Sequence, residues 1–392
     1  MEERRSSSPP PRRKATTGDW LLAFPERRPR GFRRPPGRAE RIFNSISVAM
    51  LVVFAVGWSW SIARARAAGD TGAVTPATAN IASALTEGAA PSVAYLTGAA
   101  LAALASPARG ESGKLRARIQ QPGTPIAPIL ADTLPPGAVA EFSSGAAAES
   151  TSKLVAPPRP GTWSLALKIG NAIKPLADFS VITLRPATEK RAGRLGLYYI
   201  GNWPAARKGR PGVSYDPPTG FIEVTPQNQN TQLSDHFKLK DFLPHDQQNV
   251  WPKYIVVDIK LIDKDELVLQ DLKEHGINPN GVRVLSGFRT PQYNAGGGDP
   301  RGRAALSRHM YGDANDIFID NDGDGQMDDL NHDGRVNIAD AKVILDAVNR
   351  VERAHPSLIG GCGIYSATSA HGPFTHIDTR GYPARWIGTG DS

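Results

Sequence analysis

Ser307-Arg-His-Met-Tyr-Gly-Asp-Ala-Asn-Asp-Ile-Phe-Ile319 is the stretch that decides the fold of the C-terminal part of this 392-residue chain. A histidine, His309, precedes a carboxylate, Asp316, by seven residues, and small residues lie between them. Gly312 permits a tight turn, and the Ile-Phe-Ile that follows is typical of a strand. We therefore expect a turn that enters a strand and brings both side chains to one cation.

A second segment, His371-Gly-Pro-Phe-Thr-His376-Ile-Asp378-Thr-Arg380-Gly381, holds further groups that can bind a metal. Side chains alternate along a strand, so His376 and Asp378 are expected on one face. Two imidazoles and one carboxylate are a common ligand set of catalytic zinc, in which a fourth position stays open for water. The two segments together indicate a metal centre.

The sequence around these segments predicts the elements that carry them. An apolar stripe that ends at Gly276 predicts an amphipathic helix, because glycine is favoured just after a helix C-terminus. A strand is expected over 282–288 and another helix over about 339–354. The first stripe consists of Leu261, Ile262, Val268, Leu269 and Leu272.

An acidic insert over residues 320–340 separates the two segments. Its oxygen-bearing residues have the spacing of an EF-hand calcium loop, and it resembles a dockerin-type repeat. The loop that begins at Asp329 has Gly334 at the sharp turn and Asp340, in place of glutamate, at position 12; an overlapping loop begins at Asp320. We expect structural Ca²⁺, and the alternative is a solvated acidic loop. The expected calcium ligands are Asp320, Asp322, Asp324, Asp328, Asp329, Asn331, Asp333, Asn337 and Asp340.

The positive charge of the chain is concentrated at its N-terminus. Residues 1–41 hold 12 of the 46 Lys and Arg but only 5 of the 38 Asp and Glu, so nearly all of the net charge of +8 lies there. We expect a disordered basic tail in this region. The rest of the chain is close to neutral, which argues against a nucleic-acid partner. The single cysteine, Cys362, excludes an intrachain disulfide framework.

Residues 42–63 form an uncharged apolar span of 22 residues, long enough to cross a bilayer as one helix. The basic tail before it predicts a cytoplasmic N-terminus. A cleaved signal peptide is the alternative, but the long leader and the full-length span argue against it. We expect an Ala/Pro/Gly-rich linker over 64–152, a small β domain over 153–226, and a metal-binding domain over 227–392.

The motifs of the last domain resemble those of the zinc D-alanyl-D-alanine carboxypeptidase family. The resemblance rests on Ser286-Gly-Phe-Arg289, on the Ser-x-His-x-x-Gly-x-Ala-x-Asp element over 307–316, and on His376-x-Asp378. This family includes VanX-type dipeptidases, YcbK-like periplasmic proteins and, by fold, the hedgehog signalling domain. The resemblance implies an α+β fold on an antiparallel sheet.

The same resemblance implies a function and a site. Zinc would be held by His309, Asp316 and His376, and Arg289 would receive a substrate carboxylate or carbonyl. The substrate would be a peptidoglycan stem peptide, cut by a carboxypeptidase or an endopeptidase. Together with the predicted membrane span over residues 42–63, the resemblance implies a single-pass protein of the bacterial inner membrane whose C-terminal domains face the periplasm.

The general base departs from the family pattern. Many members have a carboxylate three residues before the last histidine, and here that residue is Pro373. His371 is our preferred base, because an imidazole accepts and returns protons near neutral pH; Asp378 is the other candidate, or else an orienting group. A non-catalytic peptidoglycan- or partner-binding protein that retains the fold is the alternative function.

Overall fold

The computed structural model describes residues 110–126, 134, 138–145, 147–169, 172–205, 215–296, 304–369 and 371–388. The expected basic tail and membrane span lie outside these residues. Within the described part of the chain, no helix has the length and apolar character needed to cross a bilayer. The fold is mixed α+β, and most strand pairs are antiparallel, as the sequence predicts.

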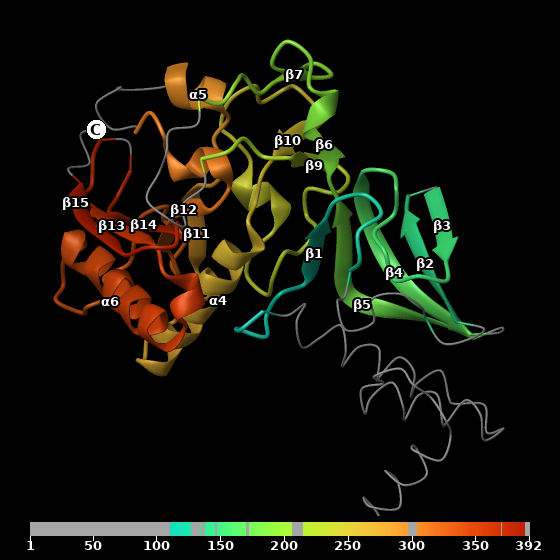
Figure 1. The fold of residues 1–392 in the computed structure, drawn as a ribbon. Helices are drawn as coiled ribbons and strands as arrows, with labels where there is room; N and C mark the ends of the chain where they lie inside the picture. The colour runs from blue at the N-terminus through green and yellow to red at the C-terminus, as the bar shows by residue number, and fades with distance from the viewer. Residues whose placement is uncertain are drawn as a thin grey trace, which may run out of the picture. The chain divides into compact units, whose positions relative to one another are not determined.

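A five-stranded sheet carries two of the three predicted zinc ligands, Asp316 and His376. Its strands are labelled in Figure 1. Its strand order is β11-β12-β14-β13-β15, and all its pairs are antiparallel except β13 with β15. The strands are β11 (Val282–Ser286), β12 (Ala314–Ile319), β13 (Gly361–Tyr365), β14 (Phe374–Asp378) and β15 (Ala384–Gly388).

Two helices, α4 (Ile259–Glu274) and α6 (Ile338–Ala354), pack together and cover one face of this sheet (Figure 1). Alternate strand residues such as Ile317, Cys362 and Ile377 point into this layer and are fully buried. The predicted apolar stripe of α4 is buried in the same core. The polar residues of the two motifs therefore lie on the opposite face of the sheet.

The ends of both helices follow from their sequences. Asp258 caps α4 by accepting a hydrogen bond from the Lys260 amide at 2.9 Å, and Gly276 takes the left-handed conformation just after it. Asn337 and Asp340 form a capping box at the start of α6. Both predicted helices are therefore confirmed to within a few residues.

A second five-stranded sheet, in the order β1-β5-β4-β2-β3, lies earlier in the chain. Two of its strands, β4 and β5, belong to the predicted small β domain. The other three fall between 117 and 151, where we expected linker, so that boundary is wrong. Small alanine and serine residues hide the alternation there: in β2 only Phe142 is large among the inward residues. The strands are β1 (Ala117–Gln120), β2 (Ala138–Ser144), β3 (Ala147–Thr151), β4 (Gly161–Ile169) and β5 (Ala172–Thr183).

Shorter elements connect the two sheets along the chain. A three-stranded sheet has the order β10-β9-β6, and β7 pairs with β8. The strands are β6 (Arg185–Pro186), β7 (Arg194–Leu195), β8 (Tyr198–Tyr199), β9 (Gly220–Val224) and β10 (Lys253–Ile255). The other helical elements of the described residues are α5 (Pro291–Gly296) and the 3-10 turns η2 (Ala187–Glu189), η3 (Leu239–Phe242), η4 (Arg308–Tyr311) and η5 (Pro356–Leu358).

Candidate metal centre

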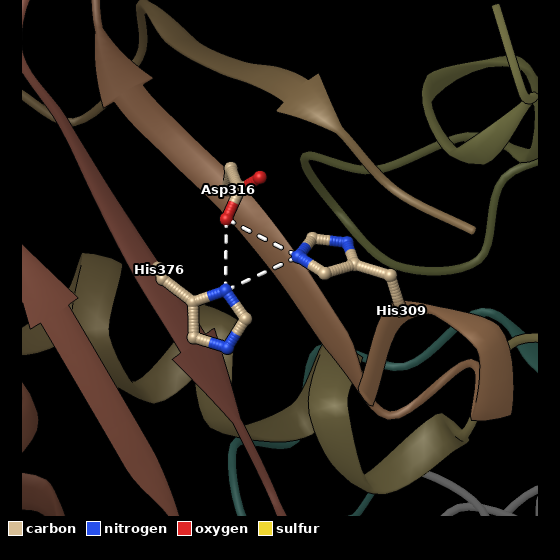
Figure 2. Close-up of side chains that lie close together, drawn as sticks. All are labelled: His309, Asp316 and His376. Atoms are coloured by element: carbon tan, nitrogen blue, oxygen red, sulfur yellow. Dashed lines mark hydrogen bonds and ion pairs between the residues drawn. The ribbon is translucent and has the colours of Figure 1, made fainter. Parts of the chain in front are cut away.

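The structure brings His309, Asp316 and His376 together, as predicted (Figure 2). His309 Nε2 lies 3.1 Å from His376 Nδ1 and 3.3 Å from Asp316 Oδ1. His376 Nδ1 lies 2.8 Å from the same Asp316 oxygen. All three residues are buried. Three potential ligand atoms therefore form a small triangle inside the protein.

Each of these residues uses its other polar atom to bind the protein. His309 Nδ1 lies 2.7 Å from the Gly287 carbonyl, which can only accept a hydrogen bond. His376 Nε2 lies 3.2 Å from Asp378 Oδ2. Arg289 Nη2 donates to Asp316 Oδ2 at 2.7 Å. A neutral imidazole has one donor and one acceptor nitrogen. With both outer nitrogens donating, three acceptor atoms therefore face one another, and either a proton or a metal ion must lie between them.

The electrostatics favour metal binding by the same residues. Burial, assisted by Arg289, lowers the pKa of His309 to about 4, so this ring is neutral at physiological pH. Burial alone would raise the pKa of Asp316, but the two histidines and Arg289 hold it well below the usual range. Burial also disfavours the charged form of His376, yet hydrogen bonds with Asp316 and Asp378 raise its pKa. Without a metal, a proton on His376 therefore bridges to Asp316.

The triangle has nearly the dimensions of a zinc site. Zinc bonds of about 2.0–2.1 Å at tetrahedral angles place neighbouring ligand atoms roughly 3.3 Å apart. The three observed separations are 2.8, 3.1 and 3.3 Å. A bound ion needs only a slight widening of the triangle. The donor set and the outer hydrogen bonds both fit zinc.

The local structure explains how the first motif reaches the site. His309 lies on η4, which ends at Gly312 with φ +76°. A Cβ at Gly312 would also overlap the backbone of Val256. Both the positive φ and this close approach therefore require glycine at this position. The chain then enters β12, where Asp316 pairs directly with His376 of β14. The predicted turn into a strand is confirmed.

One row of residues crosses the sheet at the level of the candidate metal ligands. Pairing across the five strands aligns Ser286, Asp316, His376, Gly363 and Trp386. A Cβ at Gly363 would overlap the Trp386 indole, so the indole lies across the glycine. Its ring centroid is 5.2 Å from that of His376. The sequence reasoning missed Trp386, although a glycine inside a strand signals a close approach of this kind.

A pocket of about 560 Å³ opens over the candidate metal ligands, and its volume is within the usual range of small-molecule sites. Arg289 and His371 line it. The His371 Nδ1 lies 2.8 Å from the Gly372 carbonyl, which leaves Nε2 as the acceptor nitrogen. Arg289 also donates from Nε to Ser286 Oγ at 2.9 Å. Two of the three predicted catalytic residues, Arg289 and His371, therefore line this pocket.

Asp378 lies elsewhere, behind His376. Its carboxylate is fully buried, accepts the Gly361 amide at 2.7 Å and pairs with Arg380 through two guanidinium nitrogens. Burial would raise the pKa of Asp378, but His376 and Arg380 lower it strongly, so the group is ionised. It contacts the His376 nitrogen that points away from Asp316. This position suits the orienting role and separates Asp378 from the pocket.

The acidic insert forms one carboxylate cluster in which Asp320, Asp322 and Asp328 approach one another. The other predicted carboxylate ligands belong to no such cluster within the described part of the chain. Asp340 is buried, and its two oxygens accept the backbone amides of Leu330, Asn331 and Asn337. Asp329, Asp333 and Asp340 form no such group among the described residues. Asp324, Asn331 and Asn337 accept backbone amides within their own turns.

Comparison of the chain with family models, curated proteins and solved structures finds no match.

Proposed function

We propose that this chain is a zinc metallopeptidase that hydrolyses peptide bonds in peptidoglycan stem peptides, as a carboxypeptidase or an endopeptidase. The observation that carries the zinc assignment is the triangle of three acceptor atoms, each held by an outer hydrogen bond on its other side. The reaction and substrate class rest on the resemblance of the motifs to the zinc D-alanyl-D-alanine carboxypeptidase family. The hedgehog-type fold is proposed on the same ground.

His309, Asp316 and His376 would hold the ion. Zinc supplies Lewis acidity, which polarises a carbonyl and lowers the pKa of bound water to about 7. The chain would supply the proton transfers. His371 Nε2 accepts a proton from the attacking water and returns it to the leaving amine as the C–N bond breaks. The Nδ1–H bond to the Gly372 carbonyl fixes the tautomer that this role needs.

Two further residues have supporting roles in this proposal. Asp378 orients His376. Its contact with Nε2 keeps Nδ1 of the same ring directed toward the proposed zinc position. Arg289 holds Asp316 with one guanidinium nitrogen and lines the pocket, where its remaining N–H groups would receive a substrate carboxylate or carbonyl.

Calcium is the second proposed ion, with a structural role in the insert. Asp320, Asp322 and Asp328 are its ligands in the proposal, since their oxygens lie within 4.8 Å of one another. Hard carboxylate oxygens are the ligands that Ca²⁺ prefers.

The proposed location is the bacterial inner membrane, with the N-terminus in the cytoplasm and the metal domain in the periplasm. It rests on the apolar span over 42–63 and the positive charge before it. Peptidoglycan is the proposed partner, and no nucleic acid is expected.

One experiment separates this function from the alternative, a non-catalytic binding protein. The full chain is purified in detergent, its zinc is measured by mass spectrometry, and it is incubated with purified peptidoglycan. We expect one zinc per chain and newly released amino termini, both lost in His376→Ala. A protein that binds zinc and peptidoglycan but releases no new amino termini would favour the alternative. Pro373 at the usual position of the base is the reason to test it.

A further inference from the structure

Tyr365 carries a hydroxyl group that the proposed mechanism has not used. It is the last residue of β13, two residues after Gly363, so it lies on the same face of the sheet as the metal ligands. It lines the pocket over them. Asp316 and Arg289 line the same pocket as Tyr365.

The ring of Tyr365 is held in one position by its surroundings. It stacks on Phe374 with a centroid separation of 4.5 Å and an interplanar angle of 6°. On the next strand a Cβ at Gly388 would overlap the Tyr365 ring, so glycine provides the room. Phe374 and Gly388 pair with Tyr365 on the two neighbouring strands, and they therefore hold its phenol ring in place.

Trp386 fixes the hydroxyl itself. The indole Nε1–H donates to the Tyr365 oxygen at 2.8 Å. Because an indole nitrogen can only donate, the phenolic oxygen is the acceptor and its own hydrogen remains available. Within the described part of the chain no acceptor is recorded for that hydrogen. The indole that makes this bond also lies beside His376, with ring centroids 5.2 Å apart.

An oriented donor at this position has a chemical use in amide hydrolysis. When water adds to the carbonyl carbon, the carbonyl oxygen gains negative charge, and it loses that charge when the C–N bond breaks. Donors fixed in advance near this oxygen stabilise the transition state. A phenol whose oxygen already accepts a hydrogen bond is also a stronger donor, because neighbouring bonds polarise one another.

We infer that the Tyr365 hydroxyl donates a hydrogen bond to the substrate oxygen that becomes negatively charged, and that Trp386 is the positioning residue that aims it. This inference rests on the proposed peptidase function. Burial raises the pKa of Tyr365, so the phenol keeps its proton throughout the neutral range.

The test uses the full zinc-loaded chain and the variants Tyr365→Phe and Trp386→Phe. Phenylalanine keeps the stacked ring at position 365 and removes only the hydroxyl, while at position 386 it removes the indole donor. We expect Tyr365→Phe to retain zinc and melting temperature, and to lose about 10²–10³ in kcat with KM within about threefold. Trp386→Phe should lose less. Tyr254→Phe, whose hydroxyl bonds Glu223 outside the pocket, is the matched control.

A second measurement does not depend on turnover. A phosphinate analogue of D-alanyl-D-alanine has a tetrahedral, charged centre, and its Kd is measured by calorimetry. Tyr365→Phe should weaken this binding at least tenfold, and Tyr254→Phe should leave it unchanged. Equal binding by Tyr365→Phe and wild type would overturn the inference even if the enzyme is active. A wild type that binds the analogue but cuts no peptidoglycan contradicts the proposed substrate, while a wild type that does neither contradicts both proposals.

Discussion

His376 Nε2 lies 3.2 Å from Asp378 Oδ2, on the side of the imidazole opposite Asp316. The carboxylate thereby selects the tautomer that leaves Nδ1 free for a metal. Arg380 balances the charge of Asp378, so the carboxylate stays ionised although it is buried. One ion pair behind the site thus controls the chemistry of a ligand in front of it.

Replacing Asp378 with Asn tests this relationship. The variant should bind zinc about 10–100-fold more weakly, because outer-shell carboxylates raise the basicity of a histidine ligand. Competition with a chromogenic chelator gives the Kd. The matched control is Asp313→Asn, which disrupts another buried pair, with Arg308, but does not contact His376. An equal loss in both variants would show that the effect is only structural.

Below the pKa of His376, zinc binding should release a proton from this ring. Burial disfavours the charged imidazole, but hydrogen bonds with Asp316 and Asp378 raise the pKa of His376 above its ordinary value, so below that pKa the metal-free ring carries a proton that zinc must displace. His309 contributes none, since its pKa is about 4. Apparent zinc affinity should therefore rise with pH below the pKa of His376. Calorimetry at pH 6, in buffers of different ionisation enthalpy, measures the protons released on zinc binding; binding without proton release at that pH would contradict the assignment.

His371→Ala should retain zinc and lose peptidoglycan cleavage by about 10²–10⁴, the usual effect of removing a general base. Its zinc content and melting curve should match those of wild type, because His371 is not a ligand. His275→Ala is the control, since that histidine lies at the end of α4 and does not line the pocket. Turnover by His371→Ala within threefold of wild type would assign the proton transfer to another group.

Calcium should raise the melting temperature of the wild type, since a cation relieves repulsion among Asp320, Asp322 and Asp328. Asp322→Ala should remove most of that increase. Asp324→Ala is the matched control, because it belongs to the same insert but not to the cluster. Differential scanning fluorimetry with calcium, magnesium or chelator measures the shift. If calcium does not change the melting temperature of the wild type, the insert is only a solvated acidic loop.

Cys362 should resist alkylation in the folded protein. It is fully buried on the helix-covered face of the sheet, and burial raises the pKa of its thiol to about 12. Iodoacetamide reacts with the thiolate, so at pH 8 we expect labelling only after denaturation. Because Cys362 is the only cysteine, intact-mass spectrometry gives the labelled fraction directly. Fast labelling of the native chain would show that β13 opens readily.

The sequence was most informative where one segment carries both the turn and the strand. Gly312, with Asp316 four residues later, predicted the approach to the site, because glycine at the turn and alternation in the strand are local rules. Trp386 and Tyr365 could not be found in this way. Their meeting depends on the parallel pairing of β13 with β15, a long-range contact for which only Gly363 and Gly388 give a sequence signal.

The linker boundary failed for a different reason. Alternation of apolar and polar residues indicates a strand, but the buried positions of β2 hold two alanines and a single phenylalanine, so the signal is weak. Composition there resembles a flexible spacer. In the acidic insert, the EF-hand spacing ends at Asp340. The structure adds what the spacing does not show: this carboxylate accepts three backbone amides and caps α6.

The direct pairing of Asp316 with His376 has a consequence for how the chain reaches its native state. A slip of β14 by one residue would turn Thr375 and Ile377 toward the pocket and His376 toward the helices. Such a misfolded sheet could still be compact, but it would have no complete ligand set. Zinc would thus stabilise the correct strand register selectively, because only molecules with that register have the complete ligand set and gain the free energy of zinc binding.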